Sequence, residues 1–345
     1  MKLQLVIILC SFLSAFKLNG QNLENLKNEV EKIIEFDYDL NLDEGEGIWI
    51  GVIDSDSTFI FKIGNIAGDS LSEFQLGSLS KIFTYRSLEN LLDNNEIDID
   101  SKVTDYLDLN SAYQNISFKD LGDHKSLLPK EPYFFGKRSI NPDNPYESYP
   151  EALIVPELNK YSNLYPGGNE KEFGYGHLNY AILALAMESI SEENYCSIIK
   201  ADYGSAFPSV MCSDLSKNLI WGLDKAGLPI LPWSFPSFAA SEGLSANIID
   251  FTNFIRTELL RPDDVSEISK ISKHLAFQAP WYILNLKRSQ KTYSFSGTTS
   301  AHSNFVCFDK NSQTAVVMMR NSGKGILHLP LTILDMVRSR KAKSK

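Results

Sequence analysis

Apolar, β-branched segments near both ends of the chain constrain its fold most strongly. Residues 47–53 and 58–63 are two such runs, and the polar stretch Asp54–Ser57 between them predicts a hairpin with a loop longer than the tightest turns. Four further strand patterns follow near the C-terminus, at 281–286, 293–295, 304–308 and 314–319. Because the chain between them is mainly helical, these are the only good partners for the hairpin. The sequence therefore predicts an α+β fold with one antiparallel β-sheet built from both ends.

Helical periodicity accounts for most of the remaining chain. Longer helices are predicted at 22–36, 81–94, 178–190, 245–259 (with Ser245 as the cap) and 327–339, and short ones at 103–107 and 116–121. The terminal helices should cover one face of the sheet and the helical region the other. We expect a single domain over 21–345, with a helical and irregular insertion at about 100–240. Within it, the proline- and aromatic-rich segment 128–176 predicts irregular structure over the site, either binding substrate or serving only as a structural insertion.

The N-terminus predicts a secreted or periplasmic protein. Lys2 precedes the apolar run 3–16, which is too short to span a bilayer comfortably, and Gly20 supplies a small residue before a cut ahead of Gln21. Residues 1–20 are therefore interpreted as a signal peptide, with an uncleaved anchor as the alternative. No membrane span is expected in the mature chain. The formal net charge of −10 argues against a general nucleic-acid binder.

Cysteine usage leaves two alternatives. Cys10 should leave with the signal peptide, so Cys196, Cys212 and Cys307 remain. Cys196 and Cys212 can pair across a short loop in an oxidising compartment, or all three can stay thiols, which is the alternative we favour. No Cys-x-x-Cys, His-x-x-His or His-Glu-x-x-His pattern occurs, so neither a metal nor an organic cofactor is expected.

Ser78 and Lys81 are the first candidates for chemistry. They stand three positions apart at the start of a helical pattern, so their side chains share a face. A lysine amine can take the proton of a serine hydroxyl if burial lowers its pKa from about 10.4 to near 7. Gly77 permits a sharp turn from strand to helix just before the serine. The simpler alternative is that Ser78 caps a solvated helix.

The segment Phe74–Thr84, with its Ser-Leu-Ser-Lys core, resembles the nucleophile segment of serine β-lactamases and penicillin-binding proteins. The likeness is greatest to the class C β-lactamase-like group, which also contains esterases and D-amino-acid peptidases. The resemblance covers roughly residues 30–335 in element order and concentrates at four short places. It implies a β-lactamase-like fold, acylation of Ser78, and Lys81 as a catalytic residue.

The second and third places are less regular. Tyr175 matches the tyrosine of the family's Tyr-x-Asn and would relay a proton as phenolate or phenol, its pKa lowered by the neighbouring ammonium. His177 replaces the asparagine; it can contact a substrate amide or Lys81, act as a base, or merely line the pocket. Ser241–Ala246 stands where Gly-Gly-Leu-x-Ser-Thr is common. Glu242 occupies a glycine position there and either intrudes on the pocket or faces solvent.

The fourth place departs most from the family, which carries Lys-Thr-Gly or His-x-Gly there. Phe295 takes the place of the cation, followed by Ser296 and Gly297. The backbone N–H of Thr298 can still join that of Ser78 in an oxyanion hole. A charged hydrogen bond to a substrate carboxylate, worth about 1.5–3 kcal/mol, is lost. Lys291, Arg288 and His302 are the residues that could compensate.

The sequence thus predicts a serine hydrolase that forms an acyl-enzyme with a small-molecule or peptide ester or amide. Two alternatives stay open. One is a catalytically impaired scaffold that binds cell-wall fragments or a protein partner, and the other is a β-lactamase or D-Ala-D-Ala carboxypeptidase. A Ser-His-Asp triad drawing on His124, His177, His274, His302 or His328 is disfavoured, because the sequence has no Gly-x-Ser-x-Gly elbow.

Overall fold

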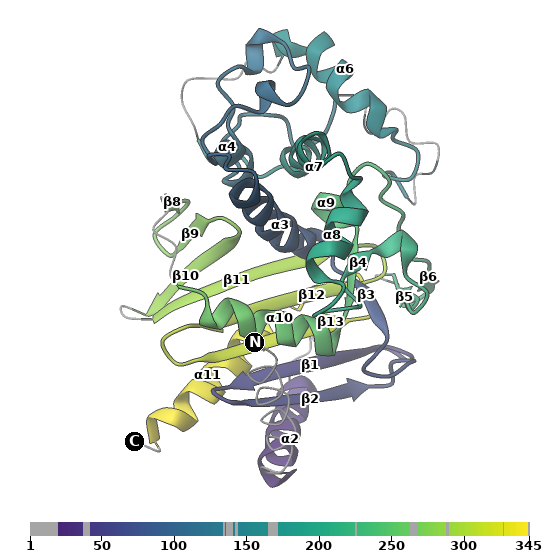
Figure 1. Cartoon of the computed structure of the whole chain (residues 1–345). Helices are drawn as coiled ribbons and strands as arrows, with labels where there is room; N and C mark the ends of the chain where they lie inside the picture. Colours follow the sequence, from purple (N-terminus) through teal and green to yellow (C-terminus); the bar gives the residue numbers. More distant parts are fainter. Residues whose placement is uncertain are drawn as a thin grey trace, which may run out of the picture.

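The computed structural model describes residues 20–343 except 37–41, 134, 136–140, 142–143, 165–171, 225, 263–267, 288–289 and 327. The predicted signal peptide, apart from Gly20, lies outside this range. The centre of the molecule is an eight-stranded antiparallel sheet in the order β2-β1-β13-β12-β11-β10-β9-β8 (Figure 1). Strand β1 (Gly47–Asp54) pairs with both β2 (Ser57–Gly64) and β13 (Thr314–Arg320). The prediction that the two ends of the chain share one sheet is confirmed.

The remaining strands extend this sheet toward the helical region. They are β12 (Ser303–Asp309), β11 (Gln290–Thr298), β10 (Trp281–Lys287), β9 (Leu275–Gln278) and β8 (Ser269–Lys270). The last two were not predicted, because they are short. The loop predicted between β1 and β2 is wrong in length: only Ser55 and Asp56 connect the strands, and Ser55 adopts φ 52°, the left-handed conformation that tight hairpin turns use.

Two helices cover one face of the sheet, as predicted. Helices α2 (Gly20–Phe36) and α11 (His328–Lys343) share a core with the residues of β1 that face them, including Ile48 and Ile50. Trp49 and Ile53 alternate with these and point into the second core, on the side of α10 (Ile248–Leu260) and the helical region. Strand periodicity thus divides the apolar residues between the two faces.

The helical region lies beyond β11 (Figure 1), and β11 and β12 both contact the turn η3 (Gly77–Leu79) that leads into it. Its helices are α3 (Ser80–Asn94), α4 (Phe118–Gly122), α6 (Ile154–Lys160), α7 (His177–Ser191), α8 (Tyr195–Tyr203) and α9 (Ala239–Glu242). Short 3-10 turns complete it: η3 (Gly77–Leu79), η4 (Val103–Asp105), η5 (Ser111–Tyr113), η6 (Glu151–Leu153), η7 (Ser162–Leu164) and η8 (Ser213–Leu215). The predicted helices at 81–94 and 178–190 are confirmed. The segment 128–176 is irregular where it is described, with only short helices.

A second, three-stranded sheet holds the strand that leads into the turn η3 (Gly77–Leu79), which contains Ser78. Strand β7 (Leu244–Asn247) pairs with β3 (Glu73–Gln75) and with β4 (Met211–Cys212), and β5 (Gly222–Leu223) pairs separately with β6 (Pro229–Ile230). The prediction of one helix over 245–259 is therefore wrong at its start. Pairing with β3 draws the first residues into a strand, and the helix begins after Asn247, whose side chain accepts a hydrogen bond from the Asp250 amide at 2.8 Å.

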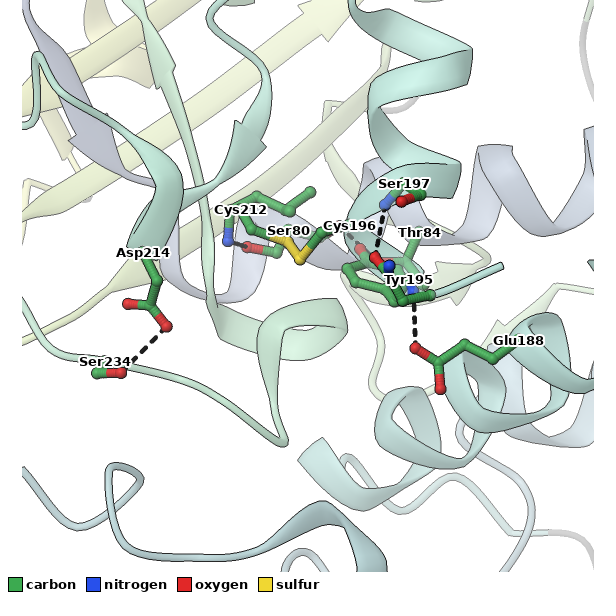
Figure 2. Close-up of a disulfide and its surroundings, with 11 residues drawn as sticks. Ser80, Thr84, Glu188, Tyr195, Cys196, Ser197, Cys212, Asp214 and Ser234 are labelled. Atoms are coloured by element: carbon green, nitrogen blue, oxygen red, sulfur yellow. Dashed lines mark hydrogen bonds between the residues drawn. A yellow bond between two sulfur atoms is a disulfide. The ribbon is translucent and has the colours of Figure 1, made fainter. Parts of the chain in front are cut away.

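A disulfide joins Cys196 on α8 to Cys212 on β4, with the two Cα atoms 5.7 Å apart (Figure 2). The preference for three free thiols was wrong, because the fold brings these two cysteines within bonding distance. Cys307 on β12 remains a buried thiol. Figure 2 shows the disulfide near the start of α3, where the hydroxyls of Thr84 and Tyr195 lie 2.7 Å apart. The bridge therefore ties α8 to the three-stranded sheet close to the helix that carries Lys81.

None of the helices in the described part of the chain combines the length and apolar character that a bilayer crossing needs. Within the same residues, no group of three or more histidine, cysteine, aspartate or glutamate side chains is arranged to hold a metal ion.

Candidate active site

Ser78 occupies the 3-10 turn η3 between β3 and α3. Gly77 adopts φ +57°, and a Cβ at this position would lie 2.8 Å from the backbone nitrogen of Thr298, so the turn requires glycine. The Nζ atom of Lys81 lies 3.3 Å from the Oγ atom of Ser78. The cap of α3 is Leu79, which makes no side-chain capping bond. The contact predicted from three-residue spacing is present, and Ser78 does not act as a helix cap.

Lys81 is completely buried. Its ammonium donates to the carbonyl oxygen of Ser241 at 2.8 Å, to Oε1 of Glu242 at 2.7 Å and to Ser78 Oγ at 3.3 Å. Burial lowers the pKa of Lys81, as the mechanism expected from the sequence requires, while the negative charge of Glu242 acts in the opposite direction. Three acceptors match the three N–H groups of an ammonium, so this geometry suits the charged form.

Tyr175 precedes α7, and its hydroxyl donates to Ser78 Oγ at 2.8 Å. Burial, followed by the charge of Glu242, raises the pKa of Tyr175 well above its usual value. The expected lowering of this pKa by the Lys81 ammonium is therefore wrong, although Lys81 Nζ lies 5.0 Å from the centroid of the Tyr175 ring. Tyr175 is therefore a neutral phenol at ordinary pH and a hydrogen-bond donor to Ser78.

Glu242 is the site residue whose role the sequence left open, and its side chain turns inward. Its Oε1 atom accepts hydrogen bonds from Ser78 Oγ at 2.6 Å, from Lys81 Nζ at 2.7 Å and from Nδ1 of His177 at 2.6 Å. Burial alone would raise the pKa of Glu242, but Lys81 and His177 lower it to about 2. One carboxylate oxygen therefore joins the serine, the lysine and the histidine. A charged residue at a usual glycine position was the available sequence signal.

His177, the first residue of α7, does more than line a pocket. Besides its contact with Glu242, Nδ1 lies 3.4 Å from Lys81 Nζ. The ring of Tyr146, from the predicted covering segment 128–176, packs edge-on to His177 with centroids 6.4 Å apart. Burial and Glu242 raise the pKa of Tyr146, which therefore stays a neutral phenol. This part of the irregular segment lies over the charged group, as predicted.

The backbone of strand β11 contacts the turn η3, which contains Ser78. A Cβ at Gly297 would lie 1.9 Å from the carbonyl oxygen of Leu76 and 3.0 Å from the amide nitrogen of Ser78. The amide of Thr298 approaches the same turn at Gly77. The backbone amides of Ser78 and Thr298 are thus neighbours, as an oxyanion hole needs. The side chains of Ser296 and Thr298 are both exposed beside the turn, where a substrate can reach them.

Phe295 is buried, with 3% of its surface exposed, and its ring packs on Tyr282 with centroids 5.2 Å apart. Successive aromatic contacts lead from there through Tyr282, Phe277, Phe173 and His124 to Tyr175. The position that carries a cation in the resembling family is therefore part of an aromatic wall.

Of the residues that could replace this cation, the two that the structure describes, Lys291 and His302, do not provide a positive charge beside Ser78. Lys291 stands over the ring of Tyr293, 4.8 Å from its centroid. His302 is fully buried, its Nδ1 accepts from the amide of Gln75, and burial lowers its pKa to about 3, so it is neutral. Arg288 lies outside the described residues.

The structure thus brings together Ser78, Lys81 and Tyr175, the three residues that the resemblance to serine β-lactamases and penicillin-binding proteins singled out. Residues 49–202 match the family model described as Beta-lactamase. No curated protein sequence matches the chain. The chain is β-lactamase-like, in sequence over that segment and in fold over nearly its whole length, and the resemblance seen in the sequence is confirmed.

Solved structures support the fold. A class C β-lactamase from Rhodobacter sphaeroides superposes with a TM-score of 0.69 at 14% identity, covering 92% of this chain and 99% of that one. A β-lactamase/D-alanine carboxypeptidase from Yersinia pestis, complexed with citrate, gives 0.70 at 16%, covering 94% and 99%. An octameric penicillin-binding protein homologue from Pyrococcus abyssi gives 0.73 at 15%, covering 94% and 78%.

Proposed function

We propose that this protein is a serine hydrolase that forms an acyl-enzyme on Ser78 and acts on an ester or amide that needs no carboxylate anchor. The observation that carries the proposal is the environment of Ser78 Oγ. It lies 2.8 Å from the Tyr175 hydroxyl and 3.3 Å from the Nζ of a fully buried lysine. Such an arrangement activates a hydroxyl that is otherwise a poor nucleophile.

In the proposed cycle, Ser78 Oγ attacks a carbonyl carbon and the oxyanion is held by the amides of Ser78 and Thr298. The leaving group departs with a proton, and water then hydrolyses the ester on Ser78. Lys81 and Tyr175 donate hydrogen bonds to Oγ and stabilise the negative charge that develops on it. Ser296 and Thr298 are exposed beside the turn and would contact the substrate, and His177, which contacts Glu242, would line the site.

The substrate class follows from charge. Phe295 offers a substrate carboxylate no charged partner, and the buried charge of Lys81 is already paired with Glu242 at 2.7 Å. Neutral esters and amides need no such partner. The neighbours described as β-lactamases or D-alanine carboxypeptidases make cleavage of carboxylate-bearing substrates the rival proposal.

The Cys196–Cys212 disulfide supports a secreted or periplasmic location, because disulfides persist in oxidising compartments. This agrees with the signal peptide predicted at residues 1–20.

The test is covalent labelling. A fluorophosphonate probe should add mass to the wild-type protein at Ser78 and none to Ser78→Ala. Absence of labelling in both proteins would reject the hydrolase and favour a scaffold that binds cell-wall fragments or a partner. Turnover of p-nitrophenyl acetate and nitrocefin should then be compared. Faster turnover of nitrocefin would overturn the assignment of a neutral substrate.

A further inference from the structure

The carboxylate of Glu242 is in direct contact with the hydroxyl of Ser78. It ends the short helix α9, and its Oε1 atom is nearer to Ser78 Oγ, at 2.6 Å, than the Nζ of Lys81 is, at 3.3 Å. Only 4% of the residue is exposed. The oxygen is therefore held against the nucleophile, away from bulk water.

The hydrogen bonds around Ser78 Oγ have a defined direction. Tyr175 donates to it at 2.8 Å and the Lys81 ammonium donates to it at 3.3 Å. A neutral phenol and an ammonium are both donors, so neither takes the serine proton in this arrangement. Glu242 Oε1 is the acceptor toward which the Ser78 hydroxyl points.

We propose that Glu242 is a catalytic residue, the general base that takes the proton of Ser78, and that Lys81 acts as a fixed cation beside it. This deepens the proposed function and rests on it. Ser78 transfers its proton to Glu242 Oε1 as the bond from Oγ to the substrate carbonyl carbon forms. When the tetrahedral intermediate collapses, the bond to the leaving group breaks and that group departs with the proton from Glu242.

Deacylation reverses the roles. A water molecule gives one proton to Glu242 Oε1 and adds its hydroxyl to the acyl carbon. The bond to Ser78 Oγ breaks, Oγ takes the proton back from Glu242, and the acid product leaves. The Lys81 ammonium and the Tyr175 hydroxyl stabilise negative charge on Oγ in both steps, and no other reactant is consumed.

The pH dependence separates the two bases in the wild-type protein. The groups that face Glu242 are Lys81, His177, Tyr175 and Tyr146, and the pKa of Glu242 among them is about 2. A carboxylate base is fully ionised throughout the neutral range, so the labelling rate should be flat between about pH 5 and 8. With Lys81 as the base the rate would rise about tenfold per pH unit while the amine stays mostly protonated.

The variants give an independent test. With a fluorophosphonate probe, and rates corrected for hydrolysis of the probe in buffer, Glu242→Gln should label Ser78 at least about 100-fold more slowly than the wild type. Glu242→Gly, which restores the glycine usual in the resembling family, should be equally slow, and Glu242→Asp should recover part of the rate because it keeps the carboxylate. Glu193→Gln, at an exposed position, is the matched control and should label like the wild type.

The possible results are distinct. An unlabelled wild type rejects the hydrolase itself. A labelled wild type with an unchanged or faster rate in Glu242→Gln or Glu242→Gly leaves the hydrolase intact and overturns the role of Glu242, which would then only restrain Ser78. A wild-type rate that climbs steadily through neutral pH also overturns it. This last measurement needs no variant, so the proposal stays testable even if the substitutions at Glu242 prevent folding.

Discussion

The hydroxyl of Tyr175 lies 2.8 Å from Oγ of Ser78, although the two residues stand 97 positions apart in the chain. Burial and the charge of Glu242 keep the phenol protonated, so it can donate to Oγ at neutral pH. The contact links the irregular segment before α7 to the nucleophile turn.

Tyr175→Phe should remove this donor with little change in shape. We expect the rate of Ser78 labelling, and kcat for p-nitrophenyl acetate, to fall about 10²–10³-fold. Tyr106→Phe, where the ring packs on Phe118 in the helical region, is the matched control and should behave as the wild type. A loss of less than about threefold in Tyr175→Phe would show that the phenol has no part in the chemistry.

The buried pair Lys81–Glu242 predicts non-additive effects on stability. Lys81→Met leaves the Glu242 carboxylate buried without its cation, which should lower the free energy of unfolding by about 3–5 kcal/mol. Lys81→Met combined with Glu242→Gln removes both charges and should be more stable than Lys81→Met alone. Urea denaturation of the two single variants and the double variant measures the coupling. Simple additivity would mean that the ion pair carries no interaction energy.

Local pattern was enough to predict most of the fold and part of the site. The contact of Ser78 with Lys81 follows from helical spacing alone, and the sheet follows from apolar runs at both ends of the chain. That the side chain of Glu242 points toward Ser78 could not be predicted in the same way. It depends on β7 pairing with β3 just after α9, and that segment was interpreted as the start of a helix.

The cysteine pairing failed for a related reason. The distance between Cys196 and Cys212 is set by the packing of α8 against β4, a two-residue strand that has no pattern of its own. The role of Phe295 as an aromatic wall likewise depends on its contact with Tyr282, a tertiary feature rather than a motif.

The close approach of β11 to the backbone around Ser78 requires glycine at position 297. In Gly297→Ala the new methyl group meets the Leu76 carbonyl oxygen at 1.9 Å, so the strand has to shift and the amide of Thr298 moves with it. We expect a loss of at least about 100-fold in kcat for p-nitrophenyl acetate and about 1–3 kcal/mol of stability. Gly174→Ala, where no atom lies within 4 Å of the new methyl, is the control. Equal activity of the two variants would contradict the close contact.

Two buried histidines predict a loss of stability in acid. Burial lowers the pKa of His302 to about 3, and burial, with Lys81 and His177, lowers that of His124 well below its usual value. The unfolded chain therefore binds more protons than the folded one below about pH 6.5, and folding stability is complete above that pH and falls as the pH decreases.

The expected slope is about 1.4 kcal/mol per pH unit for each histidine between about pH 6 and the folded-state pKa. His302→Gln should reduce the slope by about 1.4 kcal/mol per pH unit, because glutamine does not titrate. Its amide oxygen can still accept the hydrogen bond from the Gln75 amide, so the fold should be kept. Urea unfolding at about pH 7.5, 6 and 5 measures both proteins. Parallel curves for the wild type and the variant would show that His302 is not buried in its neutral form.

The disulfide predicts a stability that depends on redox state. Closing the loop between Cys196 and Cys212, 16 positions apart, should stabilise the fold by about 3 kcal/mol relative to the reduced protein. The paired variant Cys196→Ser with Cys212→Ser should therefore unfold at lower urea, and a reductant should shift the wild type but not the variant. Alkylation in denaturant without reductant should modify Cys307 and neither of the other two. Modification of all three cysteines under these conditions would contradict the bridge between α8 and β4.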